Sequence, residues 1–294
     1  MRMLLTLAIM VALAYAAVAA LIFFAQPRLV YYPEIGRSLI GTPSDAELPY
    51  ETVEITTADG ESLHGWYVPA PDATATVLFL HGNAGNISHR MGYLTMFYRL
   101  GYNTLIFDYR GYGKSSGTPT EEGTYRDAKA AWEYITQKKA IVPSNVVLFG
   151  ESLGGAVASW LAVREKPGLL VLASAFTSVP DMGAKLYPFL PVRLLSRFEY
   201  NTLEHLKDVT CPVFVAHSPQ DEIVPFEHGQ VLYEAAPSPK QFLELEGGHN
   251  NGFVYMREEW AEALGEFIDT NLGSSNDSMH SGLHLLNTVW RHLE

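Results

Sequence analysis

The segment 146–155, VVLFGESLGG, constrains the fold of this chain more than any other stretch. Four apolar residues lead into a Gly-x-Ser-x-Gly motif centred on Ser152, and a run of small residues follows it. This pattern predicts a buried strand, a sharp turn that carries Ser152, and a helix that begins at Leu153. A serine on such a turn has a strained backbone, and the residues two before and two after it must lack bulk. Gly150 and Gly154 meet this requirement. The segment therefore favours an α/β sheet with an exposed candidate nucleophile over an ordinary glycine-serine loop.

The rest of the chain alternates between strand and helix patterns. A predicted hairpin with its turn at 58–60 opens the folded part, and β-α units follow it. The expected strands are 50–55, 63–68, 76–80, 103–107, 146–149, 169–173, 213–216 and 241–245, and the expected helices include 89–100, 120–137, 225–235 and 256–271. The prediction is one mostly parallel, eight-stranded sheet with helices on both faces.

Composition excludes several classes of function. At 294 residues the chain has room for one large α/β domain, or two small ones, with appendages. A net charge of −12 and the lack of a Lys/Arg cluster argue against a nucleic-acid partner and against a basic membrane-binding patch. The single cysteine, Cys211, excludes an internal disulfide and a cysteine-based metal site, and we expect it to be a buried thiol.

Residues 3–25 form an uncharged apolar run near the N-terminus. As a helix this run would be about 34 Å long, enough to cross a hydrocarbon core of about 30 Å. The alternative is a cleaved signal peptide, since Ala17-Val18-Ala19 resembles a cleavage site. The run continues past that site and is longer than a typical signal-peptide core of about 7–15 residues. We therefore expect an uncleaved transmembrane anchor.

The flanking charges predict the orientation of this anchor. Arg2 and the α-amino group lie on one side, and Arg28 and Arg37 lie on the other. The short, charged N-terminal tail favours an N-terminus in the cytoplasm, so the folded domain is expected outside it. Tyr31 and Tyr32 suit the membrane interface. The expected organisation is an anchor at 1–27, a linker at 28–48, a catalytic domain at 49–272 and a tail at 273–294.

Two further segments leave alternatives open. Residues 176–210 interrupt the strand-helix alternation with prolines and aromatic residues. They are long enough for a small helical cap that lines an acyl pocket, or for a surface excursion with its own packing. In the tail, the apolar spacing across 283–293 predicts a short amphipathic helix, which would dock on the domain or lie at the bilayer surface.

Two residues in later loops complete a candidate catalytic set with Ser152. A serine hydroxyl needs a neighbouring base, which a carboxylate orients. Asp221 follows the expected strand 213–216, and His249 follows the expected strand 241–245. Both would lie at the carboxyl edge of the sheet, where open α/β sheets bind ligands. The order Ser, Asp, His also suits this architecture, and Glu222 is the substitute if Asp221 is misplaced.

The tetrahedral oxyanion formed during acyl transfer needs two N–H donors. Leu153 follows the nucleophile directly, and the glycine-rich loop at 81–86, HGNAGN, follows the first expected parallel strand. We expect backbone donors at Leu153 and Asn83. The loop lacks the Lys-Ser/Thr ending of a phosphate-binding loop. We expect no cofactor and no metal, because the His280/His284 pair has no carboxylate at metal-ligand spacing.

Together these motifs resemble the α/β-hydrolase superfamily across roughly residues 50–270. The resemblance rests on HGNAGN (81–86), FDYRGYGKSSG (107–117), GESLGG (150–155), the Asp221 loop and GGHN (247–250). With an N-terminal anchor and a short cap, the chain is most similar to membrane-anchored α/β-hydrolase-domain serine hydrolases. That group includes lysophospholipases, protein depalmitoylases and many bacterial hydrolases.

The function expected from the residues and the resemblance is hydrolysis of carboxylic esters or thioesters at a membrane. The expected partner is a small-molecule or lipid acyl ester. A serine aminopeptidase or amidase is the enzymatic alternative, because the same triad serves amides. A catalytically silent binding protein is the alternative from another class. Ser152 argues against a dehalogenase, which would carry Asp at that position. Asp108 and Arg110, which lie in the DYRGYG segment, are expected to play a structural ion-pair role, with contact to the substrate as the alternative.

Overall fold

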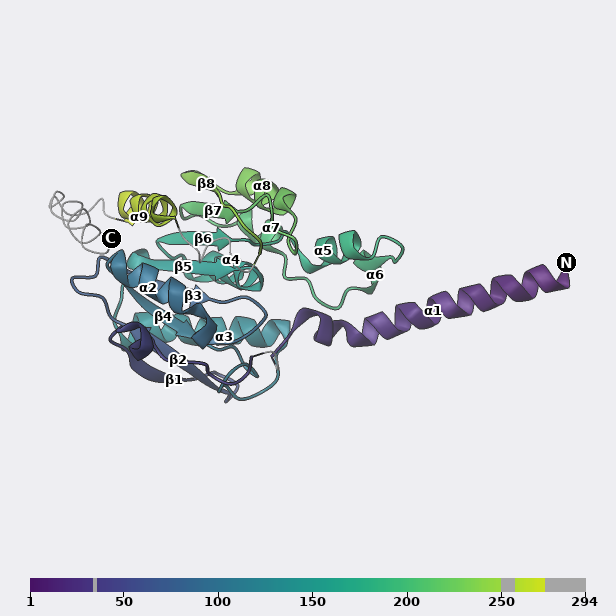
Figure 1. The fold of residues 1–294 in the computed structure, drawn as a ribbon, viewed down its shortest axis with the longest axis horizontal. Helices are drawn as coiled ribbons and strands as arrows, with labels where there is room; N and C mark the ends of the chain where they lie inside the picture. The colour runs from purple at the N-terminus through teal and green to yellow at the C-terminus, as the bar shows by residue number, and fades with distance from the viewer. Residues whose placement is uncertain (34–35, 250–256, 273–294) are drawn as a thin grey trace.

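The eight predicted strands form one sheet in the computed structural model, which describes residues 1–33, 36–249 and 257–272 (Figure 1). The strand order is β1-β2-β4-β3-β5-β6-β7-β8. Strand β2 runs antiparallel to its neighbours, and all other neighbouring pairs are parallel. The bounds are β1 Glu51–Thr56, β2 Ser62–Val68, β3 Ala75–Leu80, β4 Tyr102–Phe107, β5 Val146–Glu151, β6 Leu169–Ala173, β7 Val213–His217 and β8 Lys240–Glu244. The predicted α/β-hydrolase fold is confirmed.

Helices cover both faces of this sheet because the central strands are apolar on both sides. In β5, Val146 and Leu148 belong to one buried cluster, while Val147 and Phe149 belong to the other. The first cluster packs against α3, α4, α7 and α8, and the second packs against α2 and α9. The bounds are α2 Met91–Arg99, α3 Glu121–Glu133, α4 Leu153–Glu165, α7 Thr202–Leu206, α8 Phe226–Ala235 and α9 Glu258–Leu272.

Local capping sets where two of these helices begin. The Thr120 hydroxyl accepts the N–H of Gly123, so α3 begins at Glu121. The expected helix 120–137 changes after Glu133 into a π-helical turn, Tyr134–Lys138. A 3-10 turn, Ile87–Arg90, precedes α2 and is capped by the Asn86 side chain. These differences move boundaries and leave the β-α order unchanged.

Helix α1, Arg2–Val30, projects away from the domain (Figure 1). Its most apolar window has a mean hydropathy of 2.6, and none of that window is buried. It is the one helix among the described residues that is long and apolar enough to cross a membrane. Length and composition alone suit a signal sequence as well as an anchor.

The C-terminal end of α1 differs from the expected linker. The helix continues through Pro27 to Val30, and the Gln26 side chain ties this end to later residues by bonding to Leu195 and Arg197. Tyr31, expected at the membrane interface, is only 4% exposed. That expectation was wrong for Tyr31, because its ring packs on Phe198 and its hydroxyl bonds to the Tyr200 hydroxyl at 2.8 Å.

The segment between β6 and β7 contains α5 Val179–Leu186, α6 Val192–Leu195 and the short α7. Helices α5 and α6 extend out of the domain beside α1 (Figure 1), where Tyr15 bonds to the carbonyl of Phe189. The aromatic residues Phe198 and Tyr200 are buried in the main core. The amphipathic pattern at 283–293 and Asn250 lie outside the described residues.

Candidate active site

Ser152 lies on the sharp turn between β5 and α4 with φ of 52° and ψ of −116°. This conformation is costly for a residue with a side chain, so the surroundings must hold it. Its N–H donates to the Ala173 carbonyl at 2.9 Å, which fixes the turn to β6. A Cβ at Gly150 would lie 2.5 Å from the Gly154 carbonyl oxygen, and a Cβ at Gly154 would lie 1.9 Å from the Leu80 oxygen. Both glycines are therefore required by close backbone approach.

The structure brings the three residues of the expected catalytic set together. The Oγ of Ser152 lies 3.0 Å from Nε2 of His249, and Nδ1 of His249 lies 2.7 Å from Oδ2 of Asp221. The carboxylate can only accept, so Nδ1 carries the proton and Nε2 accepts from the serine hydroxyl. This is the geometry of a nucleophile, a base and a group that orients the base.

Asp221 is held in place and kept ionised by its surroundings. Its Oδ1 accepts the N–H groups of Ile223 and Val224 at 2.9 and 2.7 Å. Burial opposes ionisation, but the bonds from His249 and these two amides outweigh burial and hold the pKa of Asp221 below its ordinary value. Glu222, the substitute, accepts the backbone N–H of His249 at 3.1 Å instead of bonding to the ring.

Hydrogen bonds also join the loops that follow β7 and β8. The Ser218 hydroxyl donates to the Gly247 carbonyl at 2.6 Å, and the Gln220 side-chain oxygen accepts the Gly247 N–H at 2.9 Å. Beneath them, His217 is fully buried and its Nε2 donates to the Val224 carbonyl at 2.9 Å. Burial lowers the pKa of His217, which keeps it neutral beside Asp221. The two loops therefore position Asp221 and His249 as one unit.

The segments that carry the two expected oxyanion donors lie next to Ser152. Strands β3 and β5 are neighbours, with Leu80 paired to Gly150, so the loop after β3 lies next to the turn after β5. A Cβ built on Gly82 would lie 3.5 Å from the Cβ of Ser152. The N–H of Leu153 is at the start of α4, where helical amides have no intrahelical partner. The structure thus brings the loop that carries Asn83 and the Leu153 amide to the nucleophile.

An ion pair that the sequence analysis missed ties this loop to the turn. Glu151 accepts from Arg90 at 2.7 Å and from the Gly82 N–H at 3.3 Å, and Arg90 also donates to the Ala84 carbonyl at 3.2 Å. Burial opposes ionisation of Glu151, but Arg90 outweighs it and lowers the pKa of this carboxyl. A charged residue at the end of an otherwise apolar strand was the signal that could have revealed the pair.

The other side of the loop is bound to the end of α1. The Asn83 side chain donates to the Val30 carbonyl at 3.0 Å, and the Tyr32 N–H donates to the Asn83 carbonyl at 3.3 Å. Tyr32 and Ala84 form a parallel β-bridge, and the Tyr112 hydroxyl donates to the Asn83 carbonyl at 3.0 Å. The backbone of Asn83 is therefore held by the residues that follow the N-terminal helix.

Asp108 and Arg110 are structural but do not pair with each other. Arg110 binds Asp59 and Asp127, each at 2.8 Å, while Asp108 accepts the Ile87 N–H at 3.0 Å. Asp108 lies 3.8 Å from Nε2 of the buried His81. The expected ion-pair role is therefore correct for Arg110, whereas Asp108 organises the backbone around the loop after β3.

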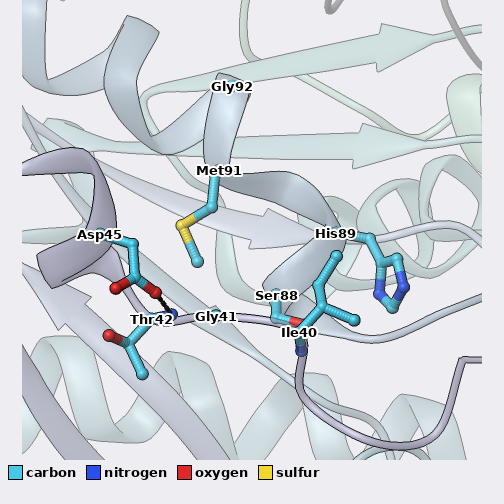
Figure 2. A pocket seen from close by; sticks show the side chains of 8 residues that line it. All are labelled: Ile40, Gly41, Thr42, Asp45, Ser88, His89, Met91 and Gly92. Atoms are coloured by element: carbon cyan, nitrogen blue, oxygen red, sulfur yellow. Dashed lines mark hydrogen bonds between the residues drawn. The ribbon is translucent and has the colours of Figure 1, made fainter.

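No group of three His, Cys, Asp or Glu side chains that could hold a metal occurs in the described part of the chain. A hollow of about 370 Å³ lies between residues 40–45 and 88–92 (Figure 2). Neither Ser152 nor His249 lines it, so it is separate from the candidate site. Within it the Thr42 N–H donates to the Asp45 carboxylate at 2.8 Å, a contact that caps the turn Pro43–Ala46.

Comparison with known proteins identifies the family of this chain. The chain is 36% identical over 257 residues to the α/β hydrolase domain-containing protein WAV2 of Arabidopsis thaliana. The matched region covers 79% of this chain and 83% of WAV2. The chain belongs to the α/β-hydrolase superfamily. This hydrolase is also 39% identical over 261 residues to an uncharacterised Mycobacterium tuberculosis protein, with 88% of this chain and 92% of that protein covered.

Two further comparisons involve proteins whose descriptions name an activity. The serine aminopeptidase S33 family matches residues 71–201. Among solved structures, the Pyrococcus furiosus esterase Pf2001 superposes with a TM-score of 0.67 at 27% identity, covering 79% of this chain and 96% of the esterase. The similarity to the esterase therefore covers most of this chain.

Proposed function

We propose that this chain is a membrane-tethered serine hydrolase that cleaves carboxylic esters or thioesters through an acyl-enzyme on Ser152. The observation that carries the proposal is the continuous hydrogen-bond chain from Ser152 through His249 to Asp221. The likeness to an esterase of known structure supports ester chemistry.

The proposed mechanism follows from the geometry of this chain. His249 Nε2 takes the Ser152 proton as Oγ attacks the carbonyl carbon of the ester, and the oxyanion forms beside the amides of Leu153 and Asn83. Collapse expels the alcohol or thiol, which receives the proton from His249. Water then attacks the acyl-enzyme, again losing a proton to His249, and Ser152 and the carboxylic acid are released. Asp221 stabilises the imidazolium and fixes its tautomer throughout.

Active-site labelling tests this assignment directly. A fluorophosphonate probe should label the purified wild-type protein, and the Ser152→Ala variant should show no labelling. Well-folded wild type that resists the probe would support a binding protein instead of an enzyme.

An aminopeptidase or amidase is the second candidate, because the serine aminopeptidase S33 family matches residues 71–201. The same triad and oxyanion donors would serve an amide bond. Comparing p-nitrophenyl esters of increasing acyl length with aminoacyl anilides distinguishes the two. A higher kcat/KM for the anilides than for the esters would contradict the ester proposal and support an aminopeptidase or amidase.

The tether is proposed to be α1, retained as an anchor with the domain outside the cytoplasm. The apolar helix and the charged Arg2 support this arrangement. N-terminal sequencing of the mature protein tests retention, and cleavage after residue 19 would show a signal peptide. A membrane-impermeant thiol reagent applied to intact cells that carry Val142→Cys tests on which side of the membrane the domain lies. Labelling is expected for a domain outside the cytoplasm, and protection from the reagent would place the domain inside.

A further inference from the structure

The outer end of the α5–α6 segment exposes a group of apolar side chains. Leu186, Phe189 and Leu194 are 62%, 61% and 86% exposed. They lie at the end of α5, in the turn that follows it and in α6. We call these three residues the cap tip. Single exposed apolar residues are common, but a group of them at one projecting end indicates a surface that contacts a membrane or another protein.

The cap tip lies against α1, so the two share an environment. The Tyr15 hydroxyl donates to the Phe189 carbonyl at 3.0 Å. Farther along the helix, the Gln26 side chain donates to the Leu195 carbonyl at 2.8 Å and accepts the Arg197 N–H at 2.7 Å. The cap therefore runs along the C-terminal half of the helix, as the ribbon also shows (Figure 1).

The Tyr15 contact sets the depth of the cap tip if α1 spans a bilayer. The helix rises about 1.5 Å per residue, so Tyr15 lies about 20 Å from Arg2 along the axis. A hydrocarbon core is about 30 Å thick. With Arg2 at the far interface, Tyr15 and its partner Phe189 lie about 10 Å inside the boundary nearer the domain. Tilting the helix increases this depth, and drawing Arg2 into hydrocarbon is opposed by the cost of burying a charge.

The charges of the segment are arranged to suit this placement. Lys185 pairs with Glu227 of α8 at 2.6 Å, and Arg193 pairs with Asp181 in the first turn of α5 at 2.7 Å. Both cations are thus neutralised by carboxylates outside the cap tip. Gln26 lies about 16 Å beyond Tyr15, which places it near the headgroups.

We propose that the cap tip is a membrane-embedded surface, in which Leu186, Phe189 and Leu194 insert into the leaflet next to the domain. This inference rests on the membrane anchor of the proposed function. Its consequence is a fixed orientation, because Tyr32, two residues after α1, pairs with Ala84 in the loop beside Ser152. The sheet edge that carries Ser152 therefore faces the bilayer, which favours lipid esters at headgroup level as the substrate class.

Depth-dependent fluorescence on the full chain tests the proposal. Cys211 is the only cysteine, so a Cys211→Ser background accepts single labels. An NBD probe is attached to Phe189→Cys in bilayers of phosphatidylcholine and phosphatidylglycerol that carry acyl-chain nitroxides. Leu13→Cys on α1 is the control for the anchor. Val142→Cys, 54% exposed at the opposite edge of the sheet, is the control for exposure to water.

The expected result is a blue-shifted, nitroxide-quenched probe at positions 13 and 189 and a water-exposed probe at 142. Quenching at 13 with water-like emission at 189 would overturn the embedded cap and leave the anchor intact. A blue-shifted probe at 189 without quenching would show that a protein, including a second copy of this chain, covers the tip. Water-like emission at 13 would show instead that the anchor itself is wrong. Leu194→Cys provides an independent label if Phe189→Cys does not fold.

Discussion

Two of the histidine–aspartate pairs near the carboxyl edge of this sheet differ in their geometry. In the first, Nδ1 of His249 is 2.7 Å from Asp221 and Nε2 is 3.0 Å from the Ser152 hydroxyl. In the second, His81 and Asp108 are fully buried and approach only to 3.8 Å. The Nε2 of His81 has no hydrogen-bond partner among the described residues.

The difference teaches that residue type alone does not make a catalytic base. Burial lowers the pKa of His81, and its Nδ1 is occupied by the Gly82 carbonyl at 2.7 Å. It therefore stays neutral and organises the loop after β3. His249 has a hydroxyl on one nitrogen and a carboxylate on the other, which is the arrangement that proton transfer needs.

The largest expected effect comes from removing the base or the nucleophile. Ser152→Ala and His249→Ala should each lower kcat by about a million-fold, because the hydroxyl and the imidazole act as a unit. Turnover of a p-nitrophenyl ester measures this loss, and circular dichroism checks that each variant is folded. A loss of kcat of ten-fold or less would show that the His249–Asp221 pair is no more catalytic than the His81–Asp108 pair.

The next largest effect is expected at the carboxylate of the first pair. Asp221→Asn should lower kcat by about ten-thousand-fold, because the amide stabilises the wrong tautomer of His249. Measured kcat in wild type and variant at one pH checks the prediction. Near-normal turnover would transfer the orienting role to Glu222, and Glu222→Gln in the same assay tests that alternative.

The matched change in the second pair should affect stability more than catalysis. Asp108→Asn keeps an acceptor for the Ile87 N–H, so kcat should change by less than about ten-fold. Asp108 also lies 3.9 Å from Nδ1 of His64, and His81 is 3.8 Å away. Replacing one buried carboxylate oxygen by an amide nitrogen beside these two rings should lower the free energy of unfolding by about 1–3 kcal/mol. Urea denaturation and the ester assay measure the two quantities. A kcat loss as large as that of Asp221→Asn would place Asp108 in the catalytic machinery.

The smallest expected effect concerns a third histidine, His205, whose Nδ1 lies 3.1 Å from the buried Ser159 hydroxyl. Burial and nearby Arg164 lower the pKa of His205 to about 4. The unfolded chain has a histidine pKa of about 6.5, so between these values it binds more protons than the native state. Stability should therefore fall as the pH falls from about 6.5 towards 4.

Thermal unfolding of wild type and His205→Gln at pH 7 and pH 5 checks this dependence. Glutamine retains a partner for Ser159 but does not titrate, so the variant should lose less Tm between the two pH values. Equal losses in both proteins would show that His205 is not a source of the pH dependence.

Much of the fold was predictable because its signals are local. Alternating apolar strands and intervening helices predicted eight strands in one mostly parallel sheet, and the Gly-x-Ser-x-Gly segment predicted the turn at Ser152. The ends of elements were less predictable. Pro27 lies inside α1 and Tyr31 is buried, because the contacts with Leu195, Arg197 and Tyr200 come from residues far along the chain.

The sequence by itself determined the residue types of the candidate site and their order, Ser152, Asp221 and His249. Only the tertiary structure decided that they meet. Strand β8 lies three positions from β5 in the sheet, a distance of about 14 Å at about 4.8 Å per strand. The six residues from Glu244 to His249 span at most about 17 Å, so the loop after β8 and the His249 side chain together reach the Ser152 hydroxyl. Hydrogen bonds to Gln220, Ser218 and Glu222 hold it there, and no local pattern could specify partners so distant in sequence.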